Sequence, residues 1–130
     1  MNRILQGLVG LFTLIFLGLG VRWMFMPFAA AAESGLELAG TLGSNTARGD
    51  LGGMFIAAAV MLVLGLVRRE PAWLRAVALL TGCIATGRVI GMLVDGFASS
   101  SAVPFVVELV MVVSLLALVR TMEPESPAPG

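Results

Sequence analysis

Charged side chains inside long apolar stretches are the residues of this sequence most able to do chemistry. Arg88 and Asp95 stand seven positions apart in the apolar stretch GRVIGMLVDG. Positions seven apart on a helix lie almost on one face, about 10.5 Å apart along the axis, which is too far for a close direct pair. A charge inside a membrane usually faces a bundle interior or a water-filled cavity and finds a partner there.

Three arginines and three carboxylates fall near the outer ends of four apolar segments, and their formal charges cancel. Planar guanidinium groups bind carboxylate or phosphate well, so this layer could line an outward-facing pocket for a small anionic or lipid-like ligand. The same residues could instead form a structural ion-pair lattice, or reach out to lipid headgroups. Together with Asn45 these six residues are called the charge layer below, which thus consists of Arg22, Asn45, Arg48, Asp50, Arg88, Asp95 and Glu108.

Composition indicates a membrane protein. Of the 130 residues, 58% are hydrophobic and 12% are charged, whereas soluble domains carry about 25% charged residues. Eight basic and eight acidic residues give zero net charge, which argues against a nucleic-acid partner. All the basic residues are arginine, a bias that we interpret as GC-rich coding and hence a bacterial source. The single cysteine excludes an internal disulfide.

Four apolar segments, about residues 4–26, 49–67, 72–94 and 103–119, each approach the roughly 20 residues that cross a bilayer as a helix. We therefore predict an all-α fold, a single four-transmembrane-helix bundle over residues 1–120, followed by a disordered cytoplasmic tail at 121–130. Pro71 and Pro104 suit the first turns of their helices. Asn45 is a plausible N-cap of the second helix, and Asp95 with Gly96 indicates the end of the third.

Small residues spaced for close helix packing accompany the charges. The predicted helix-packing positions are Gly18, Gly49, Gly53, Gly87 and Gly91. Three aromatic residues near the outer end of the first helix, Trp23, Phe25 and Phe28, fit an aromatic belt at the membrane surface.

Arginine placement predicts the orientation, because cytoplasmic loops are rich in positive charge. The predicted cytoplasmic side carries Arg3, Arg68, Arg69, Arg75 and Arg120. Both termini are then cytoplasmic, in a multi-pass protein of the bacterial inner membrane. Residues 1–33 also imitate a signal peptide, but their apolar run is longer than the usual core of 7–15 residues. We expect this segment to remain as a membrane helix.

The sequence resembles an uncharacterised family of small bacterial four-helix membrane proteins. The resemblance lies in the motifs N45-T-A-R48…G52-G53 and G87-R88…D95-G96 and in Glu108 early in the last helix. The resemblance implies that Asn45, Arg48, Gly53, Arg88, Asp95 and Glu108 belong to one constellation, with no established activity. In this sequence Thr46 stands where an acidic residue often follows the asparagine.

Function is predicted mainly by elimination. The sequence has no histidine, metal-ligand cluster or activated nucleophile, so we expect no enzyme, catalytic residue, metal site or cofactor. The favoured function is an accessory or structural subunit of a membrane complex, with the lipid bilayer and other membrane subunits, or a homo-oligomer, as partners. The alternatives are a binder of a small anionic or lipid-like ligand and a small transporter, for which Glu108 would be the coupling carboxylate.

Overall fold

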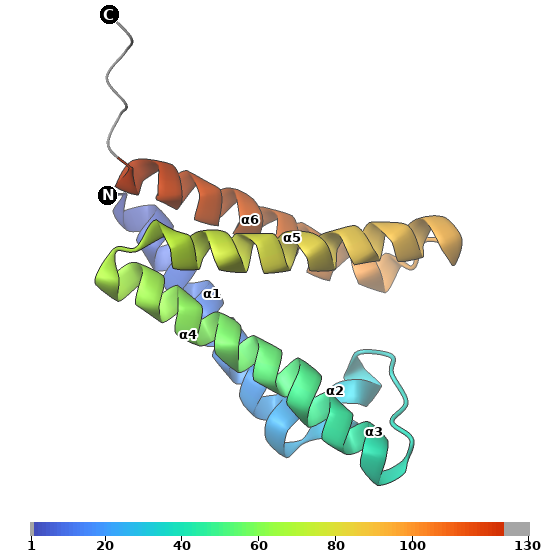
Figure 1. The fold of residues 1–130 in the computed structure, drawn as a ribbon. Coiled ribbons are helices and arrows are strands. Elements are labelled where there is room, and N and C mark those ends of the chain that lie inside the picture. Colours follow the sequence, from blue (N-terminus) through green and yellow to red (C-terminus); the bar gives the residue numbers. More distant parts are fainter. Residues whose placement is uncertain (1, 124–130) are drawn as a thin grey trace, which may run out of the picture. The chain divides into compact units, whose positions relative to one another are not determined.

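The computed structural model describes residues 2–123, which are almost entirely helical and contain no strand. The predicted all-α fold is confirmed. Four helical runs are long and apolar enough to cross a membrane, namely Arg3–Phe25, Gly40–Arg68, Pro71–Val94 and Ser99–Met122. The elements (Figure 1) are α1 (Arg3–Phe25), α2 (Pro27–Glu33), α3 (Gly40–Thr46), η1 (Ala47–Gly52), α4 (Gly53–Arg68), α5 (Pro71–Val94), η2 (Ser99–Ser101) and α6 (Ala102–Met122).

The chain divides into two compact units. One comprises Gly10–Val63 and is called the loop unit, because it includes α2, α3 and the connection between them. The other comprises Met1–Val9 and Leu64–Gly130 and is called the hairpin unit, because it contains α5 and α6.

Two predicted helix boundaries differ from those in the structure. The second span begins at Gly40 rather than near residue 49, because α3 continues through the π-helical turn η1 into α4. Asn45 therefore lies inside α3, and its prediction as an N-cap is wrong. The last helix extends to Met122, two residues into the predicted tail, whereas residues 124–130 lie outside the described part of the chain.

The break between α1 and α2 follows from a proline. Met26 leaves the helical conformation (φ −132°, ψ 53°), as expected for a residue before proline, and Pro27 then begins α2. A Schellman motif ends α2: Gly35, with φ +72°, donates to the Ala32 carbonyl, and Leu36 donates to the Ala31 carbonyl at 2.8 Å. These local signals define a short helix directly after the first span.

The small core of the loop unit is built around Trp23, which is 5% exposed. Ala30 and Ala31 of α2 and Ala47 of η1 are buried in the same cluster, with Phe55 among the apolar side chains packed against it. The prediction that Trp23 belongs to an outer aromatic belt is therefore wrong, because α2 covers the indole.

Two glycines mark the closest approach of α1 to η1 and α4. A Cβ atom at Gly20 would lie 2.6 Å from Cγ1 of Ile56 and 3.0 Å from its backbone nitrogen. A Cβ atom at Gly52 would lie 3.0 Å from Cγ of Met24 and 3.2 Å from its backbone nitrogen. A side chain at either position would force the neighbouring atoms to shift, since ordinary contacts of carbon atoms lie near 3.5–4.0 Å.

In the hairpin unit, α5 and α6 lie side by side (Figure 1). The buried positions of α5, among them Leu74, Val77 and Thr81, follow helical spacing, as do Met111 and Leu115 of α6. From residue 86 to residue 110 no side chain is fully buried. The structure therefore places the core of this unit in the half of the hairpin that contains the start of α5 and the end of α6.

The turn before α5 is tight. Arg69 has φ 54°, a left-handed conformation that disfavours residues with a side chain. Glu70 is extended and accepts a hydrogen bond from Nε1 of Trp73 at 2.6 Å. Pro71 starts α5, as the sequence predicted, because its missing N–H has no partner at that position in any helix.

Candidate functional site: the charge layer

The charge layer is divided between the two units. Arg22, Asn45, Arg48 and Asp50 belong to the loop unit, whereas Arg88, Asp95 and Glu108 belong to the hairpin unit. The structure describes pairings within each unit. That these seven residues share one layer remains a prediction.

Arg88 of α5 and Glu108 of α6 form an ion pair. Nε of Arg88 donates to Oε1 of Glu108 at 2.8 Å, and the two side chains are 36% and 13% exposed. The other carboxylate oxygen, Oε2, is buried and has no hydrogen-bond partner among the described residues. This pair ties α5 to α6, and removal of Arg88 would leave a carboxylate unpaired in a poorly hydrated site.

Arg22 near the end of α1 is paired with Glu33, the last residue of α2. Glu33 was not among the predicted members of the charge layer. The fold brings it back to Arg22 because the chain breaks at Met26 and α2 follows immediately. The Pro27 signal could have indicated this partner, since a short helix after a break can return toward the helix before it.

Arg48 of η1 is bound to the end of α1. Its Nε donates to the Met24 carbonyl oxygen at 2.9 Å, and its Nη1 lies 3.5 Å from Oγ of Ser44. The last carbonyls of a helix lack partners within the helix and carry partial negative charge, so an arginine stabilises them. Arg48 therefore acts as a tertiary cap on the first span.

The remaining polar members of the layer have no such role in the structure. Asn45, Asp50 and Asp95 are exposed, and none of their side chains has a hydrogen-bond partner among the described residues. The backbone N–H of Asp95 donates to the Gly91 carbonyl at 2.8 Å and closes α5, and Gly96 follows with φ +96°. The prediction that the third helix ends at Asp95 and Gly96 is confirmed.

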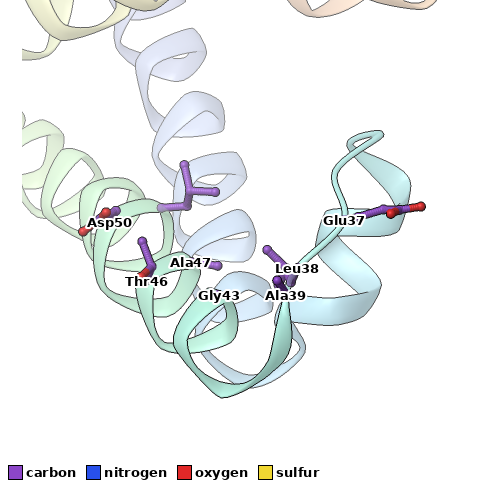
Figure 2. A pocket seen from close by; sticks show the side chains of 8 residues that line it. Glu37, Leu38, Ala39, Gly43, Thr46, Ala47 and Asp50 are labelled. Atoms are coloured by element: carbon purple, nitrogen blue, oxygen red, sulfur yellow. The ribbon is translucent and has the colours of Figure 1, made fainter.

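A shallow surface pocket of about 370 Å³ lies beside Asp50 in the loop unit. Most of its lining is small or apolar, as at Leu38, Ala47 and Leu51. Figure 2 shows the carboxylates of Glu37 and Asp50 extending away from each other. No arginine lines this pocket, so the pocket lacks the guanidinium groups that would bind an anionic ligand.

Within their own units, the five predicted helix-packing glycines are not the points of close approach. A Cβ atom at Gly18, Gly49, Gly53, Gly87 or Gly91 would have no described atom within 4 Å outside its own helical surroundings. The close approaches occur at Gly20, Gly52 and, against Leu74, at Gly65. The predicted positions are therefore open within their units, and their role in helix packing remains a prediction.

These features define a class of protein: a multi-pass α-helical membrane protein with ion pairs between helices and an arginine cap at a helix end. Among the described residues, no group of three or more His, Cys, Asp and Glu side chains could hold a metal ion.

The chain belongs to the family described as domain of unknown function (DUF4345), which matches residues 4–119. The resemblance to an uncharacterised domain family is thereby confirmed. Comparisons with curated proteins and with solved structures give no match.

Proposed function

We propose that this protein is a small accessory or structural subunit of a membrane complex. The observation that carries the proposal is the engagement of the three arginines of the charge layer. Arg22 binds Glu33, Arg48 binds the Met24 carbonyl, and Arg88 binds Glu108. Each contact joins two helical elements, so the charges act as ties between helices.

A ligand-binding function would require these guanidinium groups to exchange their protein partners for the ligand. A proton-coupled transporter would want an unpaired carboxylate within the membrane, whereas Glu108 is held by Arg88 at 2.8 Å. Both alternatives are therefore less well supported than a structural role.

The test is native mass spectrometry of the tagged protein, extracted in mild detergent from its own membrane. We expect a heavier assembly that contains unlike chains and is missing from a control preparation of an unrelated tagged four-helix protein. A bare chain with a reproducible small adduct would instead establish a ligand binder. A bare chain without unlike partners or an adduct would also contradict the proposal.

We further propose the bacterial cytoplasmic membrane as the location, with both termini in the cytoplasm. The arginine distribution supports this orientation, because Arg68, Arg69, Arg75 and Arg120 all lie near the helix ends assigned to the inner side.

Cysteine labelling tests the orientation. In a Cys83→Ser background, Ser99→Cys and Thr121→Cys each place one thiol at an exposed position near opposite ends of α6. A membrane-impermeant maleimide applied to intact cells should label position 99, and position 121 only after permeabilisation. The reverse pattern would place both termini outside.

A further inference from the structure

We propose that the groove between the cytoplasmic halves of α5 and α6 binds one anionic phospholipid of the inner leaflet. This inference goes beyond the proposed function, because the chain would carry the site whether or not unlike subunits bind it. The groove has a volume of about 460 Å³, and the residues that define it are Arg75, Leu79, Gly82 and Cys83 of α5 with Val112 and Leu116 of α6.

The dimensions of the groove fit an acyl chain within one leaflet. Its lining on α5 extends from Arg75 to Thr86, and at 1.5 Å per residue these positions span about 16 Å. Half of a hydrocarbon core of about 30 Å is nearly the same length. The groove therefore begins near one membrane surface and ends near the bilayer midplane.

The wall of the groove is apolar and its floor is open. Gly82 has no atom within 4 Å of the position that a Cβ atom would occupy, which leaves room for a methylene chain to lie against the backbone. The one hydroxyl along the wall, that of Thr86, donates to the Gly82 carbonyl at 2.8 Å. An acyl chain would thus meet few unsatisfied polar groups.

Positive charge lies at one end of the groove. Arg75 is in the first turns of α5, and Arg120, four positions after Leu116 on the same face of α6, is in its last turn. Because α5 and α6 are antiparallel neighbours, both guanidinium groups lie at the same end of the hairpin. Glu123 pairs with Arg75, so the three side chains together retain one positive charge.

This charge distribution favours an anionic phospholipid over a neutral one. A phosphate group accepts hydrogen bonds from guanidinium groups, and basic residues at the membrane surface attract anionic headgroups. Arg75 is bonded through Nη2 to one oxygen of Glu123, and its side chain is 53% exposed. It can therefore contact a phosphate without leaving its present partner.

The test compares lipid retention by native mass spectrometry after the protein is extracted from vesicles of phosphatidylglycerol and phosphatidylcholine with identical acyl chains. We expect wild-type protein to retain one phosphatidylglycerol in preference to phosphatidylcholine. Equal retention of the two lipids, or retention of neither, would overturn the proposal. Since this comparison uses only the wild-type chain, it does not depend on the folding of any variant.

Two matched substitutions locate the lipid. Gly82→Leu would fill the groove and should abolish the preference, whereas Gly87→Leu, on the same helix and equally open but outside the groove lining, should preserve it. Unchanged phosphatidylglycerol retention by folded Gly82→Leu would overturn the assignment to this groove.

Arg75→Gln and Arg120→Gln test the headgroup contact. Each substitution should weaken phosphatidylglycerol retention about fivefold, because a surface arginine contributes about 1 kcal/mol to the attraction of an anionic headgroup. Arg69→Gln, in the preceding turn, is the control. Equal effects of all three substitutions would indicate general surface charge and would contradict a specific site. Competition by inorganic phosphate should have no effect, because the acyl chain supplies part of the recognition.

Discussion

Gly20→Ala is the substitution that tests most directly the contact between α1 and α4. The new methyl group would lie 2.6 Å from Cγ1 of Ile56 and 3.0 Å from its backbone nitrogen. The side chain of Ile56 can yield by rotation, but the backbone nitrogen cannot, so the two helices must separate slightly. Overpacking of this kind typically costs about 1–3 kcal/mol.

The helix itself gains from the same substitution. Alanine is more favourable than glycine in a helix interior by about 1 kcal/mol, so the net loss at Gly20 should be about 0–2 kcal/mol. Gly18→Ala, two positions earlier on α1, is the matched control because nothing lies within 4 Å of its Cβ position. Gly18→Ala should therefore be neutral or stabilising, and the two variants should differ by about 1–3 kcal/mol.

The assay is unfolding in mixed micelles with increasing dodecyl sulfate, followed by far-ultraviolet circular dichroism. Equal free energies of unfolding for the two variants would refute the assigned contact. A double-mutant cycle with Ile56→Ala adds a second check, because removing Cγ1 should restore part of the loss at Gly20. Rescue should be incomplete, since the backbone nitrogen of Ile56 remains.

Three further predictions can be tested by the same unfolding assay. Trp23→Ala should cost about 3–5 kcal/mol because the indole is buried, whereas Phe25→Ala, at a position that is 77% exposed, should change stability by less than about 0.5 kcal/mol; similar losses would contradict the core around Trp23. Arg69→Gly should raise the free energy of unfolding by up to about 1 kcal/mol, because glycine adopts the left-handed backbone without strain. Arg68→Gly in the last turn of α4 should lower it by about 1 kcal/mol, and the opposite order would refute the turn geometry. Arg48→Ala should cost about 1–3 kcal/mol by leaving a helix-end carbonyl unpaired, and an unchanged midpoint would exclude its capping role.

Of the three arginine contacts in the charge layer, only the one between Arg88 and Glu108 could be anticipated in part from the sequence. The sequence placed Arg88 and Glu108 in the same charge layer, and the structure joins them in an ion pair. The partner of Arg22 could not be read from spacing, because Glu33 is eleven positions away across a helix break. Neither could the partner of Arg48, since a backbone carbonyl has no signature in the amino-acid sequence.

The glycines show why helical periodicity alone did not predict the points of close contact between helices. The predicted packing positions of the second helix assume a regular α-helix with 3.6 residues per turn. The structure instead has the π-helical turn η1 over Ala47–Gly52. A wider turn shifts every face that follows it, and the close contact falls at Gly52 instead of Gly53. On α1 the apolar residues surround much of the helix, so the hydrophobic pattern alone does not indicate which face of α1 is packed.

Four apolar runs, the proline and glycine breaks between them and the scarcity of charge determine a helical membrane protein, because backbone groups in lipid must form hydrogen bonds within helices. Those features are local and therefore readable in the sequence. Only the tertiary structure decided that Trp23 is a core residue, that Glu33 and the Met24 carbonyl hold two arginines, and that Arg75 lines a groove along α5 and α6. Such contacts depend on which helix faces meet, and helices that are apolar on most sides do not specify this by their pattern alone.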